Sequence, residues 1–140
     1  MPGEYLVADP KGRTLTIGAI ERQKFAYKVS RDNQTLSISS PLEAHRNNTL
    51  TLAMVAVDNG LENPQFACLE IEYGEADDAQ AAVVTGKAQK VVALYEVDLG
   101  LHHVVRKSVE PVPESAHALI AIQGGADQGG PGGVIVACKD

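Results

Sequence analysis

The amino-acid sequence predicts an all-β fold built from antiparallel strands. In the segment 94–99, one side of the chain carries Leu94, Glu96 and Asp98 and the other carries Tyr95, Val97 and Leu99. This is the period-two pattern of an extended strand, and Gly100 then breaks it where the chain must bend. Other apolar stretches are separated by short polar connectors such as Asp9-Pro10-Lys11-Gly12, in which proline fixes φ and glycine accepts a positive φ. No segment shows a convincing helical periodicity, so the prediction is one strand after another along the chain.

The first 40 residues contain four predicted strands, which lie at Tyr5–Ala8, Thr14–Ile20, Phe25–Val29 and Leu36–Ser39. Glu21–Lys24 is expected to be a polar connector, and a turn is expected at Arg31-Asp32-Asn33-Gln34. Four strands of this length joined by tight polar turns are typical of an antiparallel meander.

Two further groups of strands follow the first. The predicted strands are Thr49–Val57, Phe66–Tyr73, Val91–Leu99 and a stretch from Leu101, and then Ala118–Ile122 and Val134–Cys138. Spacing of this kind fits a sandwich, a barrel or a β-propeller, and the residue pattern alone does not choose among them.

Two connections stand out by composition. Residues 74–90 contain Glu75, Asp77 and Asp78 followed by an alanine-rich stretch. We expect a mobile insertion there, with a short alanine-based helix as the alternative. Residues 124–133 hold six of the 13 glycines together with Pro131, and they predict a flexible hairpin loop.

The composition is that of a folded, acidic protein. The 140 residues are enough for one domain, and a hydrophobic content of 44% is well above that of a disordered chain. Asp and Glu exceed Lys and Arg by 18 to 12, and the net charge of −6 argues against binding nucleic acid through its phosphates. No apolar run approaches the roughly 20 residues needed to span a bilayer, and no secretory signal opens the sequence.

The search for a metal site centres on His102 and His103, with Asp98 and His45 as further candidates. Adjacent histidines on one strand point to opposite faces, so the pair is unsuited to a metal ion that needs three or four convergent ligands. We expect one histidine of the pair to be packed or hydrogen-bonded and the other to face solvent. The sequence therefore predicts no metal-binding residue.

Catalytic and cofactor-binding residues are not predicted either. The sequence has no Gly-x-Ser-x-Gly nucleophile elbow, and Cys68 lies outside any local signature of a cysteine nucleophile. The loop at 124–133 lacks the residues of a phosphate-binding loop and the spacing of a dinucleotide-binding turn. Cys68 and Cys138 are expected to be buried free thiols in a reducing, intracellular compartment. Glu70 and Glu72 alternate with apolar residues, which predicts a solvated strand face or a patch that faces a partner.

Four collinear segments of the sequence resemble one known family. They are Ala8-Asp-Pro-Lys-Gly-Arg13, Ser39-Ser-Pro-Leu-Glu-Ala-His45, Glu62-Asn-Pro-Gln-Phe-Ala-Cys-Leu-Glu70 and Tyr95-Glu-Val-Asp-Leu-Gly-Leu-His-His-Val-Val-Arg-Lys107. In these segments the chain resembles the spliceosome-associated 130-kDa family, the third subunits of the splicing factor 3b complex. The resemblance spans nearly all 140 residues, and it is weakest at 74–90 and irregular at 124–133.

This resemblance selects the β-propeller among the possible folds, because the family is built from several propellers in one much longer chain. It implies that residues 1–140 are a piece of the first propeller. Antiparallel four-stranded, WD40-like blades are then expected at about 5–40 and 49–110, with an incomplete blade at 118–140. About two and a half blades expose apolar faces and unpaired edges, so the isolated chain is expected to self-associate or to be only partly stable.

The resemblance also implies a function. Members of the family are non-catalytic scaffolds in the splicing factor 3b complex of the U2 small nuclear ribonucleoprotein, which acts in the nucleus in pre-mRNA splicing and branch-site recognition. The implied partners are the large helical-repeat subunit, a small companion subunit and other spliceosomal proteins. No cofactor, membrane contact or sequence-specific binding of nucleic acid is expected.

Two other functions remain as alternatives. Related triple-propeller proteins include the adaptor of a DNA-repair ubiquitin ligase and the largest subunit of the cleavage and polyadenylation factor, although the four segments look closer to the splicing member. An enzyme, such as a hydrolase or a lyase on a β scaffold, needs convergent titratable groups in a pocket, and the sequence supplies only isolated ones.

Overall fold

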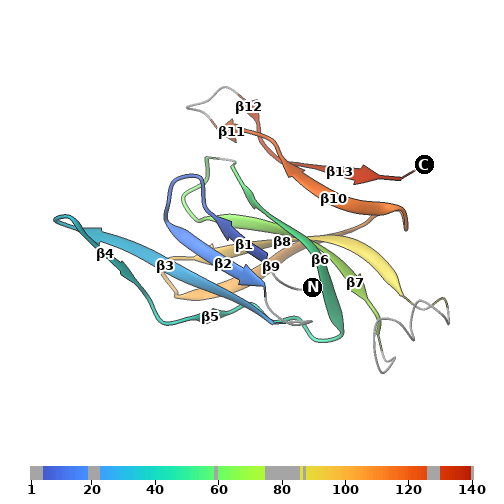
Figure 1. The fold of residues 1–140 in the computed structure, drawn as a ribbon, viewed down its shortest axis with the longest axis horizontal. Helices are drawn as coiled ribbons and strands as arrows, with labels where there is room; N and C mark the ends of the chain where they lie inside the picture. The colour runs from blue at the N-terminus through green and yellow to red at the C-terminus, as the bar shows by residue number, and fades with distance from the viewer. Residues whose placement is uncertain are drawn as a thin grey trace.

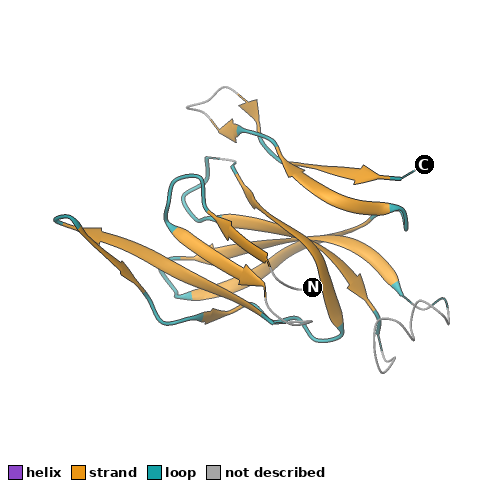
Figure 2. Cartoon of the chain, in the orientation of Figure 1, coloured by secondary structure: helices purple, strands orange, loops and turns teal. Residues whose placement is uncertain are grey.

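The computed structural model describes residues 5–18, 23–58, 60–74, 86, 88–125 and 130–139, and within these ranges the chain forms strands, turns and loops (Figure 2). The strands build three layers that follow one another in the order of the sequence (Figure 1). Among the described residues no helix has the length and apolar character that crossing a bilayer requires.

The first sheet is four strands wide. It contains β1 (Tyr5–Ala8), β2 (Thr14–Gly18), β3 (Lys24–Asp32), β4 (Thr35–Ile38) and β5 (Leu42–Glu43), and all pairs are antiparallel. Because β4 and β5 pair in succession with the same edge of β3, they act as one outer strand interrupted at Pro41, which has no N–H for the ladder. At the interruption, the backbone N–H of Lys28 donates to Ser39 Oγ over 2.9 Å, so a side-chain hydroxyl replaces a ladder carbonyl.

The turn between β3 and β4 is tighter than the sequence predicts. It contains only Asn33 and Gln34, with φ angles of 47° and 84°. A two-residue hairpin turn with positive φ at both positions matches the twist of the flanking strands, which allows β3 to continue to Asp32.

The second sheet is a meander of four antiparallel strands: β6 (Thr49–Val57), β7 (Gln65–Glu72), β8 (Gln89–Asp98) and β9 (His103–Pro111). In β7 every residue from Gln65 to Glu70 is buried, because the other two sheets cover both faces of this strand. Asp98 shapes the turn before β9, since its Oδ1 accepts the N–H groups of Gly100 and Leu101 at 3.0 and 2.9 Å.

The third sheet is a narrow ribbon. Its long arms are β10 (Ala116–Ala121) and β13 (Val134–Cys138), and the ribbon continues into the short pair β11 (Gly124–Gly125) and β12 (Gly130–Pro131). A Cβ atom on Gly124 would lie 2.2 Å from backbone atoms of Gly132. The two arms can therefore approach this closely only because residue 124 is glycine.

The first strands of the three sheets lie in a row, because β1 packs along β6 and β6 along β10. Tyr5 Oη on β1 donates a hydrogen bond of 2.6 Å to the carbonyl of Leu52 on β6. Two apolar cores result. The core between the first and second sheets contains Ala26, Ala44, Met54, Phe66, Cys68, Ala93, Tyr95 and Val97, and the core between the second and third contains Val57, Ala67, Leu69, Ala116 and Leu119.

The predicted all-β, antiparallel fold class is confirmed, and the predicted strands lie close to their expected positions. Two details were wrong: Lys24 is not in a connector but opens β3, and the short strand β5 was missed. The hairpin predicted at 124–133 contains the short antiparallel pair β11–β12. Residues 19–22, 75–85, 87 and 126–129 lie outside the described residues. The end of the second predicted strand and the insertion at 74–90, with its alternative helix, fall largely there.

Candidate interaction surfaces and a buried ionic cluster

A buried ion pair joins the first sheet to the second. Lys24 opens β3, and Glu70 lies near the end of β7 on the face that the first sheet covers. Lys24 Nζ is 2.8 Å from Glu70 Oε2, and both side chains are completely shielded from solvent. The ammonium is close enough for an ion pair but badly angled for a hydrogen bond, so charge attraction dominates the contact.

Glu70 is also held by residues of its own sheet. Arg106 on β9 places Nη2 2.8 Å from Glu70 Oε1 and 2.8 Å from Glu72 Oε1. The phenol of Tyr95 on β8 donates a hydrogen bond of 2.7 Å to Glu70 Oε2. Two cations thus balance two carboxylates, which reduces the free-energy cost of burying these charges.

These five residues form one unit, which we call the ionic cluster: Lys24, Glu70, Glu72, Tyr95 and Arg106. Aromatic rings close one side of it. The Tyr95 ring stacks on Phe66 with the ring centroids 5.0 Å apart, and Lys24 Nζ lies 5.3 Å from the Tyr95 centroid, within cation–π range. Burial raises the pKa of the nearby Cys68 thiol, which therefore stays protonated and unreactive.

The pKa of Glu70 lies below its ordinary value. Burial by itself raises this pKa, because the carboxylate loses its hydration. The charge of Lys24 and the hydrogen bonds that Glu70 accepts outweigh burial and keep the carboxylate ionised. For Tyr95, burial and then the neighbouring carboxylate raise the pKa of the phenol. The phenol therefore stays protonated and can donate a hydrogen bond to Glu70.

Acidification is expected to weaken the ionic cluster. Because the folded pKa of Glu70 lies below its ordinary value of 4.5, the ionised group stabilises the fold above pH 4.5, and this stability is lost as the pH falls through the folded pKa. Urea unfolding of the native chain and of Glu70→Gln should be compared between neutral pH and about pH 3. The other carboxyl groups titrate in both proteins, so a difference between the two pH dependences reports on Glu70 alone. The native chain should therefore lose more stability on acidification than Glu70→Gln does. Equal slopes would contradict this assignment.

The predicted solvated face is wrong for Glu70. Both carboxylates do lie on one face of β7, but the first sheet covers that face and leaves only Glu72 partly exposed. Period-two alternation assigns residues to faces without telling what packs on each face. The signal that the sequence offered was the position of Glu70 as the one acidic residue within the otherwise apolar run 66–71.

The candidate metal ligands do not come together. His102 lies in the turn before β9 with a φ of 55°, His103 begins β9, and both are exposed, so neither is packed in the interior. His45 Nδ1 instead accepts the backbone N–H that opens β3, over 3.0 Å. Within the described ranges, no three His, Cys, Asp or Glu side chains converge on a possible metal position. Cys68 is buried as predicted, but Cys138, at the end of β13, is exposed.

A second polar link joins the first two sheets at the turn after β1. The carboxylate of Asp9 accepts hydrogen bonds from Arg13 Nε at 2.7 Å and Arg13 Nη2 at 2.9 Å. Arg13 Nη1 donates to the backbone carbonyls of Leu61 and Glu62, in the loop before β7. One guanidinium therefore ties the first turn of the chain to the second sheet.

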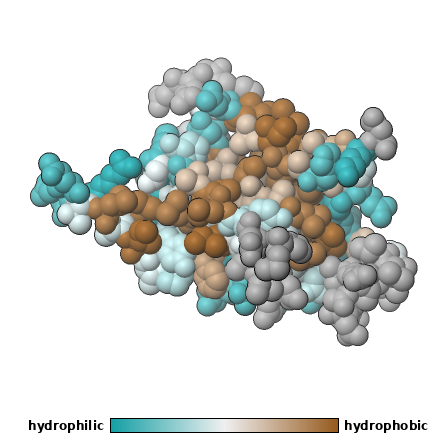
Figure 3. All heavy atoms as spheres, viewed as in Figure 1, coloured by the Kyte–Doolittle hydropathy of each residue, from teal (hydrophilic) through white to brown (hydrophobic). Residues whose placement is uncertain are grey.

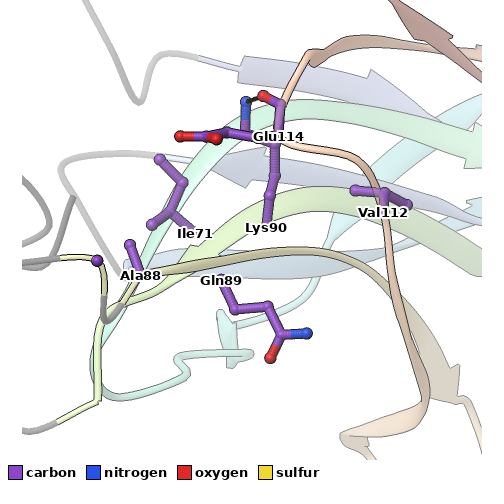
Figure 4. Close-up of a pocket in the computed structure, with 7 residues that line it drawn as sticks. Ile71, Ala88, Gln89, Lys90, Val112 and Glu114 are labelled. Carbon is purple, nitrogen blue, oxygen red and sulfur yellow. Dashed lines mark hydrogen bonds between the residues drawn. The ribbon is translucent and has the colours of Figure 1, made fainter.

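A hollow of about 260 Å³ lies beside β8, and its described lining is Ile71, Gly86, Ala88, Gln89, Lys90, Val112 and Glu114 (Figure 4). Lys90 Nζ donates to the carbonyls of Glu114 at 2.7 Å and Ala116 at 2.8 Å, so this amine holds the connection between β9 and β10. The described lining residues provide no nucleophile paired with a base.

Apolar side chains are exposed at both ends of the stack. The outer face of the first sheet carries Leu6, Leu15, Ile17, Phe25, Tyr27, Val29, Leu36 and Ile38. On the third sheet, Ile120 and Ile135 are 55% and 49% exposed. In Figure 3, apolar groups gather over the first sheet at the left and over the third sheet at the upper right. Exposed apolar faces of this kind are typical of interaction surfaces.

Comparisons with known proteins agree with this arrangement. Residues 1–140 match the family model described as the RSE1/DDB1/CPSF1 first beta-propeller. Similar curated proteins include "Splicing factor 3B subunit 3" of Drosophila melanogaster, at 52% identity, the protein of the same name from Danio rerio, at 48%, and "Spliceosome-associated protein 130 A" of Arabidopsis thaliana, at 46%. Each match covers 100% of this chain and 11% of the relative. The resemblance in the four segments is thereby confirmed, and the chain belongs to the RSE1/DDB1/CPSF1 first β-propeller family.

Proposed function

We propose that this chain is a non-catalytic part of a scaffold in the splicing factor 3b complex of the U2 small nuclear ribonucleoprotein, acting in the nucleus in pre-mRNA splicing and branch-site recognition. The observation that carries the proposal is the identity of 46–52% over the whole chain to relatives named as splicing factor 3B subunit 3 and spliceosome-associated protein 130. The chain corresponds to 11% of the length of those relatives, so the proposed role is that of one part of a scaffold of this kind.

We also infer that the three sheets are successive blades, at about 5–40, 49–110 and 118–140. The row of β1, β6 and β10 supports this division, because the first strand of each blade lies nearest the axis of a propeller. In this view the ionic cluster and the Asp9–Arg13 link fix the angle between the first two blades. A rigid arrangement suits a scaffold, since it presents edges and loops to partners without a loss of conformational freedom on binding.

The proposed partners are proteins, namely the large helical-repeat subunit and the small companion subunit of the complex. Two properties of the chain favour protein partners over nucleic acid. Its net charge of −6 opposes contact with phosphates, and apolar residues are exposed on its outer faces.

Affinity capture of the tagged parent polypeptide from nuclear extract tests the proposed function. Splicing factor 3b subunits and U2 small nuclear RNA should be recovered, and the protein subunits should remain bound after ribonuclease treatment because they contact the scaffold directly. The tag expressed alone is the control. Recovery of cullin ligase components, or of cleavage and polyadenylation factors, in place of splicing subunits would overturn the proposal and favour the other members of the family.

A further inference from the structure

We propose that the ionic cluster holds one internal water molecule between the first and second sheets, bound by Lys24 and Thr51. Each of these side chains carries a buried polar atom, Nζ of Lys24 and Oγ1 of Thr51, that has no hydrogen-bond partner among the described residues. Lys24 is 0% exposed and Thr51 is 1% exposed. A buried polar atom without a partner costs free energy, and an ordered water molecule commonly removes that cost.

The two atoms lie beside the same carboxylate. Thr51 on β6 is the register partner of Glu70 on β7, so their side chains are neighbours on the face that the first sheet covers. Residues directly opposite each other in this way have Cβ atoms about 4.5 to 5.5 Å apart. Lys24 Nζ reaches Glu70 from the other sheet and lies 2.8 Å from its Oε2. The hydroxyl and the ammonium are therefore within reach of one water molecule.

Glu70 supplies the third partner of this water. A carboxylate has about four lone-pair positions, and the hydrogen bonds from Tyr95 and Arg106 occupy two of those on Glu70. The water accepts a hydrogen bond from Lys24 Nζ and donates one to Glu70 and one to Thr51 Oγ1. Three hydrogen bonds are the usual number for a buried water molecule.

The residues beside Lys24 on its own sheet are small. The backbone N–H of Ala44 donates to the carbonyl of Lys24 over 2.9 Å, which places Ala44 directly across from it, and Ala26 follows on the same face of β3. Neither side chain extends beyond a methyl group. The first sheet therefore leaves space beside the amine at both positions.

Water fits this position better than an anion, because the charges of the ionic cluster already balance. Lys24 and Arg106 are the cations, and Glu70 and Glu72 are the carboxylates. A chloride ion adds one uncompensated negative charge beside a completely buried carboxylate, which is costly. Arg106 Nε is also buried without a partner, but it approaches from β9, on the opposite side of β7 from Thr51.

A crystal structure of the parent polypeptide, at a resolution that shows ordered water, tests the site directly. One water molecule is expected at about 2.7 to 3.2 Å from both Lys24 Nζ and Thr51 Oγ1. Crystals soaked in bromide should show no anomalous signal at this position. A direct hydrogen bond between Lys24 and Thr51, a position without density, or a bromide peak would each overturn the proposal.

The variant Thr51→Val tests the same site by hydrogen–deuterium exchange of the parent polypeptide. Valine has the shape of threonine but cannot bind the water, so the amides of β3 and β6 should exchange about tenfold faster. If no water is bound, valine removes a buried hydroxyl that lacks a partner, which leaves exchange unchanged or slows it. The direction of the change therefore distinguishes the two cases.

The matched control is Thr49→Val. Thr49 lies on the same strand and face as Thr51 and is equally buried, and its hydroxyl donates a hydrogen bond of 2.7 Å to the carbonyl of Arg46. This control measures the effect of losing one hydrogen bond, and Thr51→Val should accelerate exchange to a similar extent. Exchange in Thr51→Val that is as slow as in the native protein would contradict a bound water. Neither experiment depends on the proposed role in splicing.

Discussion

Replacing Glu70 with glutamine is expected to lower the free energy of unfolding by about 3 to 5 kcal/mol. Glutamine has nearly the same shape as glutamate, so packing changes little, but the completely buried ammonium of Lys24 loses its counter-charge. Arg106 loses one of its two carboxylate partners at the same time. Since small domains are stable by only about 5 to 15 kcal/mol, this single change removes a large share of the total.

Urea denaturation of the native chain and of Glu70→Gln, at one fixed protein concentration, measures this loss. The matched control is Lys107→Gln, which breaks an ion pair in the same sheet: Lys107 Nζ is 3.8 Å from Glu96 Oε2, and the lysine side chain is 49% exposed. An exposed pair of this kind contributes less than about 1 kcal/mol. Losses of equal size in the two variants would show that the Glu70 pair is not buried in solution.

Replacing Leu69 with alanine is expected to cost about 2 to 5 kcal/mol. Leu69 on β7 is fully buried in the core between the second and third sheets, where it packs with Ala116 and Leu119 of β10. The substitution removes apolar burial and leaves a cavity that the two sheets can close only in part. Because the third sheet is a narrow ribbon, we expect its attachment to the second sheet to loosen before the rest of the fold.

Hydrogen–deuterium exchange checks this second prediction together with thermal melting. The amides of β10 and β13 should exchange faster in Leu69→Ala, while the amides of β2 and β3 in the first sheet should change much less. Leu101→Ala is the control, because that side chain is 71% exposed and makes little contribution to either core. Uniformly faster exchange over all three sheets would contradict a local attachment of the third sheet through Leu69.

Most of the strands could be predicted because their residues alternate or because turn residues bound them. Thr49–Val57 and Val134–Cys138 have the predicted bounds, and so does Tyr5–Ala8. The short strand β5 was missed because two residues next to Pro41 carry no pattern, and only their pairing with β3 makes them a strand. The choice of a propeller came from the family resemblance, since alternation and turn spacing fit several β architectures equally well.

The ionic cluster could not be predicted, because it depends on the packing of one sheet on another. Lys24 and Glu70 are separated by 46 positions in the sequence, and neither belongs to a motif. A charged residue in a strand normally indicates a solvated face, and this rule is wrong at Glu70. Glu70 can be buried because Lys24 of the neighbouring sheet pairs with it. The sequence does not show which sheet faces are in contact, so this pairing could not be predicted.

The coupling free energy between Lys24 and Glu70 tests most directly the claim that the first two sheets are held together as neighbouring layers. It is obtained from the unfolding free energies of the native chain, Lys24→Met, Glu70→Gln and the double variant. We predict a coupling of at least about 2 kcal/mol, because the double variant removes both buried charges and avoids the cost of leaving one alone. A coupling below about 0.5 kcal/mol would contradict the account, since it would mean that the two side chains do not meet in the folded chain.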